Sequence, residues 1–188
     1  MSHTMRLFFG IPIDDEVSGA LFDSIATLSS RADGVKWIPA ANYHVTLCFL
    51  GDTDERTAEA IDAELSHIDS LPDSFEITFE GVGFFPPRGR NVRIIHTPVT
   101  RGETMCRRLF ETVSAVCRRH LPDRRYKCTP HVTLGRVKRT PKVDLRDVAA
   151  GVSLYRSTTC DRFVLYESTL GPEGARYTAR KSYRLPAV

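Results

Sequence analysis

The sequence predicts an α+β protein with antiparallel sheets, and three observations point to this fold class. About three helical segments and seven or more short strand-like runs are recognisable among the 188 residues. Hairpin turns connect most of the strands, whereas a regular strand–helix–strand alternation would indicate a parallel sheet. The tetrapeptide His-Val-Thr-Leu occurs twice, at 44–47 and at 131–134. Because the second copy begins 87 residues after the first, close to half the chain length, we expect two similar halves that face each other.

The first half of the chain contains two amphipathic helices between short strands. Asp14 and Asp15 provide capping and first-turn acidic residues for the first helix, and Asp54 is the expected N-cap of the second. In both helices the apolar residues recur at helical spacing, which is typical of a helix with one buried face. The expected elements are strands at 6–11, 35–38, 44–50 and 75–80, and helices at about 15–30 and 55–68.

The second half contains one long helix and most of the remaining strands. A turn rich in glycine and proline at 81–90 has neither the Gly-Lys-Ser/Thr ending nor the following helix of a phosphate-binding loop. The helix expected at about 102–120 is basic on its outer face. The other expected elements are strands at 92–96, 131–137, 152–155, 162–166 and 175–185, a basic loop at 138–142 and a turn at 171–174.

Each copy of the repeated tetrapeptide lies in a run that is typical of a half-buried strand. Side chains alternate between the two faces of a strand, so His44 and Thr46 share one face and their apolar neighbours share the other. The same holds for His131 and Thr133 in the second copy. A single His-x-Thr is more commonly a polar pair on a sheet surface. Its repetition in two halves favours a shared cleft to which each half contributes one imidazole and one hydroxyl.

Strict alternation would also place Cys48 on the cleft face. No activating group stands beside it in the sequence, so we interpret Cys48 as a small apolar filler. The chain has five cysteines, an odd number, and no Cys-x-x-Cys spacing. Neither a disulfide scaffold nor a zinc ribbon is therefore indicated.

The net charge is only +3, but the charge is unevenly distributed. Residues 101–142 contain twelve Lys/Arg and three Asp/Glu, and the rest of the chain is acidic. A basic segment of this kind suggests an anionic partner such as nucleic acid. The alternative is a solvated helix face, and the sequence leaves both interpretations open for the paired arginines of the long helix.

Composition places the chain among ordinary globular domains, with 41% hydrophobic and 26% charged residues. The length predicts one domain, 1–188, built from two lobes. No apolar run is long enough to cross a bilayer, and no charged-then-apolar leader is recognisable. We expect a cytoplasmic protein that is a monomer and does not bind membranes.

Two facing His-x-Thr pairs have the groups needed to cleave a phosphodiester. With pKa values near ~6.5, one imidazole can take a proton from water while the other protonates the departing oxygen. The two threonine hydroxyls can donate to the phosphate oxygens as negative charge develops. A zinc site is the rival interpretation, but it needs three or four His, Cys, Asp or Glu ligands, and no His-x-His or His-Glu-x-x-His occurs. Cysteine or serine nucleophiles are also disfavoured, because no motif marks one.

These residues resemble the paired motifs of a known family. The first motif continues as Phe49-Leu50-Gly51, and the second is preceded by Pro130 and followed by Arg136. Together they resemble the two-histidine (2H) phosphoesterases, and most closely the RNA 2′,3′-cyclic phosphodiesterases, also called 2′-5′ RNA ligases. The likeness extends over nearly the whole chain, through segments 6–9, 83–86, 165–168 and 174–177.

The resemblance implies a bilobal fold, with two antiparallel sheets and outer helices around a pseudo-two-fold central cleft. It also implies hydrolysis of a terminal 2′,3′-cyclic phosphate of RNA to a 2′-phosphate, with no metal and no cofactor. By analogy, His44 is the acid on the leaving 3′-oxygen and His131 is the base for water. Thr46 and Thr133 hold the phosphate, and Arg136 is a further candidate for substrate binding.

The sequence departs from the family pattern at one position and raises a question at another. Members commonly carry a tryptophan in the strand after the Gly-x-Phe-Pro turn, where this chain reads Val-Arg-Ile-Ile-His at 92–96. A different substrate preference would follow if that tryptophan shapes the cleft. Strict alternation places Arg136 on the face opposite His131, so it reaches a phosphate only if Gly135 permits a bulge or twist. The other interpretation of Arg136 is a surface salt bridge.

Two alternatives to RNA-end hydrolysis stay open at this point. In the first, the cleft binds a nucleotide or an RNA end without turnover. In the second, the same cleft ligates RNA through a 2′-5′ bond or hydrolyses a small cyclic phosphate. The basic segment at 101–142 favours RNA, because neutralising several phosphates contributes affinity that a small molecule does not need.

Overall fold

The computed structural model describes residues 4–88, 91–172 and 174–187. Its helices are α1 (Asp15–Ser24), α2 (Ala26–Arg31), α3 (Glu55–Leu65), α4 (Glu103–His120) and α5 (Leu145–Ala149), with a 3₁₀ turn η1 (Ala40–Asn42). Its strands are β1 (Thr4–Pro12), β2 (Val35–Trp37), β3 (His44–Asp54), β4 (Phe75–Glu80), β5 (Gly83–Phe85), β6 (Ile94–Arg101), β7 (His131–Val137), β8 (Tyr155–Cys160), β9 (Arg162–Gly171) and β10 (Gly174–Arg184). The α+β class predicted from the sequence is confirmed.

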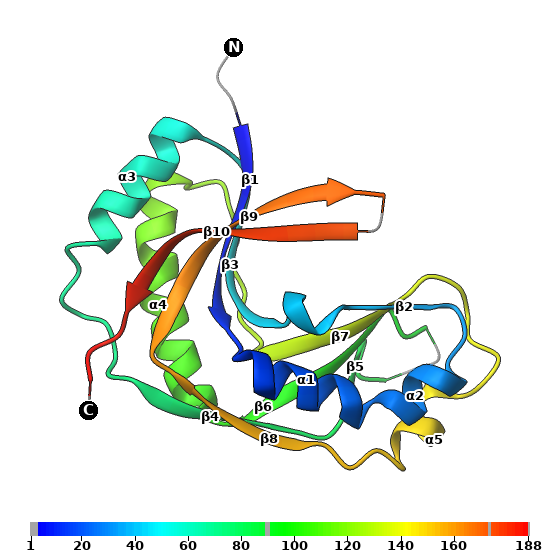
Figure 1. The fold of residues 1–188 in the computed structure, drawn as a ribbon. Helices are drawn as coiled ribbons and strands as arrows, with labels where there is room; N and C mark the ends of the chain where they lie inside the picture. The colour runs from blue at the N-terminus through cyan, green and yellow to red at the C-terminus, as the bar shows by residue number, and fades with distance from the viewer. Residues whose placement is uncertain (1–3, 89–90, 173, 188) are drawn as a thin grey trace.

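The strand pairings are antiparallel throughout the described residues, and they run in the order β10-β9-β1-β3-β7-β6-β4-β8. Strand β2 adds to β7, and β5 adds to β6. One lobe is formed by β1, β3, β9 and β10, and the other is built around β5, β6 and β7 (Figure 1). The lobes meet where Val45 of β3 pairs with Val132 of β7. The two predicted sheets are thus joined at the repeat itself.

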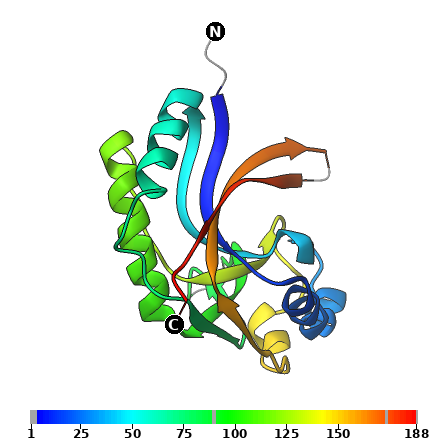
Figure 2. The ribbon, with the colours of Figure 1, turned by 60° about the vertical axis from the view of Figure 1, so that its left-hand side comes forward.

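The helices lie on the outside of this curved sheet. Helices α3 and α4 lie together on one side of β1 and β3, and the β9–β10 hairpin projects from the other side (Figure 2). Helix α4 buries its apolar stripe against β3, with Leu109, Val113 and Val116 fully buried. Its basic residues remain on the outer face. This two-sided character explains why the sequence of α4 alternates between apolar and basic residues at helical spacing.

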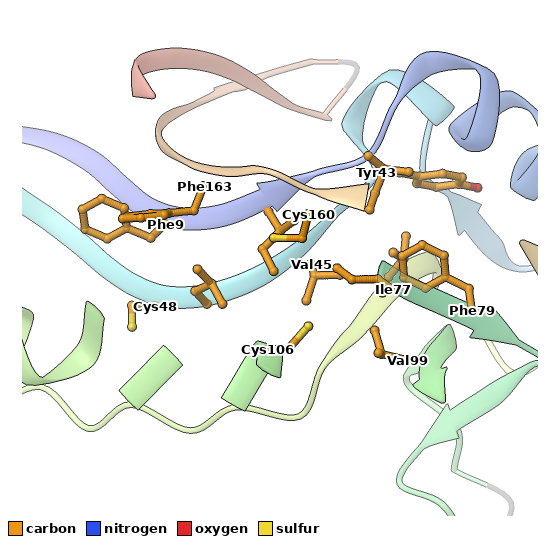
Figure 3. Close-up of a cluster of buried hydrophobic side chains, with 14 of the residues drawn as sticks. Phe9, Tyr43, Val45, Cys48, Ile77, Phe79, Val99, Cys106, Cys160 and Phe163 are labelled. Carbon is orange, nitrogen blue, oxygen red and sulfur yellow. The ribbon is translucent and has the colours of Figure 1, made fainter. Parts of the chain in front are cut away.

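The core fills the space between the sheet and α4 and continues under both lobes. Val45, Phe79 and Val99 belong to one cluster of buried side chains that joins the two lobes (Figure 3). Cys48 points into this cluster toward α4. There, a hydrogen bond with the thiol of Cys117 and burial raise the pKa of the Cys48 thiol. Strict alternation would place Cys48 on the cleft face, but the structure places it in the core. Its interpretation as an apolar filler agrees with this burial.

Two helical predictions differ from the structure. The single helix expected at about 15–30 is broken at Ile25, whose backbone N–H donates to Phe22 three residues back and so tightens the turn between α1 and α2. Fully buried Ile25 thereby stays in the core while the chain changes direction. Helix α5 is absent from the predicted elements, because five residues are too few for an apolar period to be recognised.

The strand expected at 152–155 is wrong in position. The observed strand is β8, which carries only polar side chains from Arg156 to Thr159. It forms because each of its residues pairs with β4, from Phe75 opposite Cys160 to Glu80 opposite Tyr155. An edge strand held by its backbone needs no apolar alternation, so sequence periodicity cannot locate it.

The other predicted elements agree with the structure apart from their ends. The return strand expected at 92–96 starts at residue 94 and extends to 101, and the predicted turn before it contains the short strand β5. The turns predicted at 81–90 and 171–174 include Gly89, Arg90 and Glu173, which lie outside the described residues. Within the described ranges, no helix is long and apolar enough to cross a membrane.

Candidate active site

The four side chains predicted to form the site come from the two strands at which the lobes meet. Val45 lies opposite Val132 in an antiparallel register, and both valines are fully buried. In such a register the flanking residues also face each other, so His44 lies across from Thr133 and Thr46 lies across from His131. Identical tetrapeptides paired about their own valines create a local two-fold axis. The repeat therefore brings both imidazoles and both hydroxyls to one face of the sheet.

The two histidines are oriented in the same way. Nδ1 of His44 lies 2.8 Å from the carbonyl oxygen of Asn42, and Nδ1 of His131 lies 2.5 Å from that of Thr129. A carbonyl oxygen only accepts, so each Nδ1 carries the proton and donates it. Nε2 is then the basic nitrogen in both rings. It lies 3.0 Å from the hydroxyl of Thr46 in the first copy and 3.4 Å from that of Thr133 in the second.

Burial and positive charge favour the neutral form of both imidazoles. The pKa of His44 is lowered to about 4, chiefly by burial and also by positive charge at His131 and Arg136, against the opposing effect of the Asn42 carbonyl. Burial also lowers the pKa of His131, again with a contribution from Arg136. The effect on both pKa values means that the guanidinium lies within electrostatic reach of both rings. An anion bound between the two imidazoles would replace the positive electrostatic potential at the rings with a negative one.

A β-bulge in each repeat sets which side chains reach the cleft. In β3 the partners of Phe9 and Gly10 are Cys48 and Thr46, so Leu47 is left unpaired. In β7 the partners of Ile95 and His96 are Gly135 and Thr133, so Leu134 is left unpaired. The extra residue reverses the alternation beyond it. The residue three positions after the threonine therefore joins the histidine face, which is Phe49 in the first copy and Arg136 in the second.

The bulge resolves the position of Arg136 in the structure. Arg136 lines the same cleft as Thr46 and Thr133, although strict alternation from the sequence assigned it to the opposite face. Gly135 makes this arrangement sterically feasible, because a Cβ there would lie 2.8 Å from Val35 and 3.0 Å from Trp37. Strand β2 packs over the bulge in the space that the missing side chain leaves. No salt bridge of Arg136 is formed among the described residues.

The cleft beside the histidines has a volume of about 460 Å³, and its lining includes residues of β2 and of the β9–β10 hairpin. Its lining carries four Lys/Arg side chains and, within the described part of the chain, no Asp or Glu. Such a lining favours an anionic ligand. The lining side chains include Arg6, Phe8, Lys36, Trp37, Asn42, His44, Thr46, Phe49, Thr133, Arg136, Lys138 and Tyr177. His131 is not part of this lining and stands beside the hollow.

Aromatic rings fix each histidine from its own lobe. The ring of His44 lies 4.9 Å from that of Phe8 and 5.2 Å from that of Tyr177, measured between centroids. The ring of His131 lies 5.1 Å from both Phe85 and His96, edge-on to each. Sequence analysis missed these contacts. The alternation in β1, which puts Arg6 and Phe8 on one face, was a signal that could have identified two of the cleft residues.

His96 occupies the strand in which family members commonly carry a tryptophan. His96 is 6% exposed, and its ring stacks on that of Phe85 at a centroid distance of 4.1 Å. Gly83 makes room for it, since a Cβ there would lie 2.5 Å from the imidazole. Burial, with the charge of His131, lowers the pKa of His96 to about 4. The ring that supports His131 is therefore neutral and largely enclosed, as an indole would be.

The described residues contain no group of three or more His, Cys, Asp or Glu side chains arranged to hold a metal ion. The four predicted site residues and Arg136 are thus surrounded by cations, aromatic rings and backbone carbonyls. This environment suits a phosphate group that is held by hydroxyls and a guanidinium.

Comparison with known proteins relates this geometry to a family. The family model for LigT-like phosphoesterases matches residues 11–96. An RNA 2′,3′-cyclic phosphodiesterase of Archaeoglobus fulgidus is 39% identical over 85 residues, which are 45% of this chain and 47% of that protein. The protein of the same name from Bacillus subtilis is 30% identical over 109 residues, 58% of each chain. The sequence matches thus span about half the length of these curated relatives.

Solved structures show the same fold over nearly the whole chain. The crystal structure of TT0787 of Thermus thermophilus has a TM-score of 0.76 at 27% identity, covering 97% of this chain and 99% of that one. The crystal structure of E. coli LigT complexed with 3′-AMP has a TM-score of 0.74 at 21% identity, covering 98% and 99%. The predicted bilobal arrangement is confirmed by these likenesses.

Proposed function

We propose that the chain is a LigT-like phosphoesterase, since the family model and the curated relatives match about half of it, and that it hydrolyses 2′,3′-cyclic phosphate ends of RNA to 2′-phosphomonoesters. The observation that carries the proposal is the antiparallel pairing of Val45 with Val132, which presents two imidazoles and two hydroxyls on one face. Relatives named RNA 2′,3′-cyclic phosphodiesterase support the choice of reaction.

The reaction needs one proton acceptor and one proton donor on opposite sides of the phosphorus. Nε2 of His131 takes a proton from water as the water oxygen bonds to phosphorus. The bond between phosphorus and the 3′-oxygen breaks, and Nε2 of His44 delivers a proton to that oxygen. The product keeps the phosphate on the 2′-oxygen and has a free 3′-hydroxyl. The carbonyls of Asn42 and Thr129 keep each Nδ1 protonated, so both rings present Nε2 to the reaction.

The other groups act on the phosphate oxygens. Thr46 and Thr133 donate their hydroxyl hydrogens, and these bonds strengthen as charge accumulates in the transition state. Arg136 contributes a full positive charge that the bulge places on this face. Bound phosphate also raises the pKa of the nearby histidines from their depressed values, which supplies the protonated acid at neutral pH. No step requires a metal ion.

The first experiment is hydrolysis of an oligoribonucleotide with a 2′,3′-cyclic phosphate end in excess EDTA. We expect turnover, a bell-shaped pH profile and a product that carries its phosphate on the 2′-oxygen, identified by phosphorus NMR. His44→Ala and His131→Ala should each lower kcat by roughly 10²–10⁴. His67→Ala is the matched control, because His67 is exposed at the end of α3. Near-normal activity of both site variants would disprove the proposal.

A second measurement assigns the acid and the base. A p-nitrophenyl phosphodiester has a leaving group that departs without protonation, so loss of the acid matters less for this substrate. We expect His44→Ala to recover most of its deficit on the aryl ester, whereas His131→Ala stays impaired. The reverse pattern would exchange the two roles and leave the proposed reaction intact.

A further inference from the structure

We propose that a basic groove next to the cleft binds the sugar-phosphate backbone of the single-stranded RNA that precedes the cyclic phosphate. The groove runs between residues 91–93 and the loop at 137–146, and it has a volume of about 790 Å³. The proposal rests on the proposed function and adds a substrate class to it. The preferred substrate becomes an RNA chain several nucleotides long, in place of a cyclic mononucleotide.

The groove adjoins the cleft. Lys138 lines both hollows, so this residue lies at the boundary between them. Arg136, two residues earlier on β7, lines the cleft alone. A chain whose terminal phosphate lies beside Arg136 therefore meets Lys138 next and then enters the groove.

The charge of the groove fits a polyanion. Its lining contains five Lys/Arg side chains and one carboxylate, Asp144. That carboxylate already accepts the backbone N–H of Arg146 at 2.9 Å, where it caps α5. Arg93, Arg139 and Lys142 are exposed, and no salt bridge neutralises any of them within the described ranges. Exposed cations in a row provide most of the affinity of single-stranded nucleic-acid sites.

The loop that carries these cations is held in place by its backbone. The carbonyl of Gly34 accepts N–H groups from Lys138 at 2.8 Å and from Arg139 at 3.1 Å. Asp33 accepts the N–H of Lys142 at 2.9 Å. Gly34 has a φ of 73°, and a Cβ there would lie 2.6 Å from the carbonyl oxygen of Arg139. The backbone is thus anchored, and the side chains remain available to a ligand without ordering the loop first.

The other basic residues of segment 101–142 do not serve this path. Arg108 and Arg118 are exposed on the outer face of α4, and α4 covers the side of β3 opposite the histidines. Part of the excess positive charge seen in the sequence therefore lies away from the cleft, on the outer face of α4. Within this segment, Arg136 and Lys138 line the cleft and Arg139 and Lys142 line the groove, and the outer face of α4 provides a matched control of equal charge.

The test compares substrates of different length in two double variants. The groove variant is Arg139→Gln/Lys142→Gln, and the control is Arg108→Gln/Arg118→Gln. For wild type, kcat/KM should be higher for an octaribonucleotide with a cyclic phosphate end than for 2′,3′-cyclic AMP. In the groove variant, kcat/KM for the octaribonucleotide should fall by about tenfold or more, and kcat/KM for the mononucleotide should stay near the wild-type value. In the control variant, kcat/KM should stay near the wild-type value for both substrates.

Salt dependence provides a second readout. Each lost phosphate contact should flatten the slope of log(kcat/KM) against log[salt] by roughly 0.7 for a single strand, so the groove variant should lose about 1.4 in slope for the octamer. Equal slopes in the groove and control variants, or no length dependence in wild type, would overturn the proposal.

A binding measurement tests the RNA-binding groove independently of the proposed hydrolysis. If wild type turned over no cyclic phosphate, the proposed function would fail. The groove would then still be tested by fluorescence anisotropy with a labelled octaribonucleotide that ends in a 2′-phosphate. Weaker binding and a flatter salt slope in the groove variant alone would support the groove, and identical binding in both variants would refute it.

Discussion

At the scale of single residues, the site depends on a guanidinium that reaches two imidazoles. Arg136 lies on the cleft face and lowers the pKa of both His44 and His131. The same charge that disfavours protonated histidine in the free protein attracts the phosphate that reverses this effect. We therefore propose that Arg136 links phosphate binding to the protonation of the histidine that acts as the acid.

Arg136→Gln should raise the pKa of both histidines, because removing a nearby positive charge makes the protonated form less costly. We expect kcat/KM for a cyclic-phosphate RNA to fall about 10- to 100-fold, which corresponds to roughly 1.5–3 kcal/mol for a lost charged hydrogen bond. NMR titration of the imidazoles reports the pKa values. Arg136→Lys keeps the charge and is the control. Unchanged histidine pKa values in Arg136→Gln would contradict the electrostatic link.

His96 affects the pH dependence of stability, because its imidazole is buried in the second lobe. Its pKa is lowered to about 4 by burial first and by His131 second. In the unfolded chain a histidine titrates near ~6.5. As the pH falls from 6.5 toward 4, the unfolded state takes up a proton that the folded state refuses. The folded protein therefore loses stability over this range and regains it as the pH rises.

His96→Phe should remove this part of the pH dependence while preserving the stack on Phe85. We expect the free energy of unfolding to drop by roughly 1–2 kcal/mol less between pH 7 and pH 5 in the variant than in wild type. Urea unfolding at the two pH values measures the difference. His67→Phe, at an exposed position in the turn after α3, should leave the wild-type drop unchanged. Equal drops in wild type and His96→Phe would rule out His96 as the cause.

At the scale of elements, the bulges in β3 and β7 decide the composition of the cleft. The unpaired Leu47 in β3 and Leu134 in β7 reverse the alternation and bring Phe49 and Arg136 beside the threonines. The backbones of the two repeats are thus similar, but the side chains at the equivalent positions differ. The first repeat has an aromatic ring, Phe49, and the second has a cation, Arg136. The Phe49 ring is further covered by the guanidinium of Arg6 at 4.8 Å.

Gly135→Ala tests the bulge in β7. The added Cβ would meet Val35 at 2.8 Å and Trp37 at 3.0 Å, so β2 must shift. We expect a loss of roughly 1–3 kcal/mol of stability from overpacking, together with reduced activity as Arg136 moves. Gly19→Ala in the middle of α1 is the control, because no atom lies within 4 Å of its Cβ. This control should gain about 0.5–1 kcal/mol. A Gly135 variant as stable and active as wild type would show that the bulge tolerates a side chain.

At the scale of the whole molecule, we propose that the two lobes unfold as one unit, the single domain 1–188. One buried cluster contains Phe9 and Leu47 from the first lobe together with Ile95 and Val132 from the second. Neither lobe can expose its share of this core without exposing the other's.

Calorimetry should therefore give one transition whose calorimetric and van't Hoff enthalpies agree. The core variant Val132→Ala should shift the whole transition to lower temperature without splitting it, since it removes buried methyl groups at the junction of the lobes. Two resolved transitions, or a shift in only one of them, would show that the lobes are separate folding units.

The sequence by itself determined the α+β class, the helices at α3 and α4, and the four side chains of the repeat. These features depend on local hydrophobic periodicity and on a tetrapeptide that is repeated in the sequence. The tertiary structure alone decided that Arg136 joins the cleft, that Cys48 turns toward α4, and that β8 pairs with β4. It also placed Arg136 and Lys138 at the cleft and Arg108 and Arg118 on the outer face of α4. The physical reason is that register, bulges and edge pairing depend on which strand lies alongside, and a partner distant in sequence leaves no periodic pattern in the residues it positions.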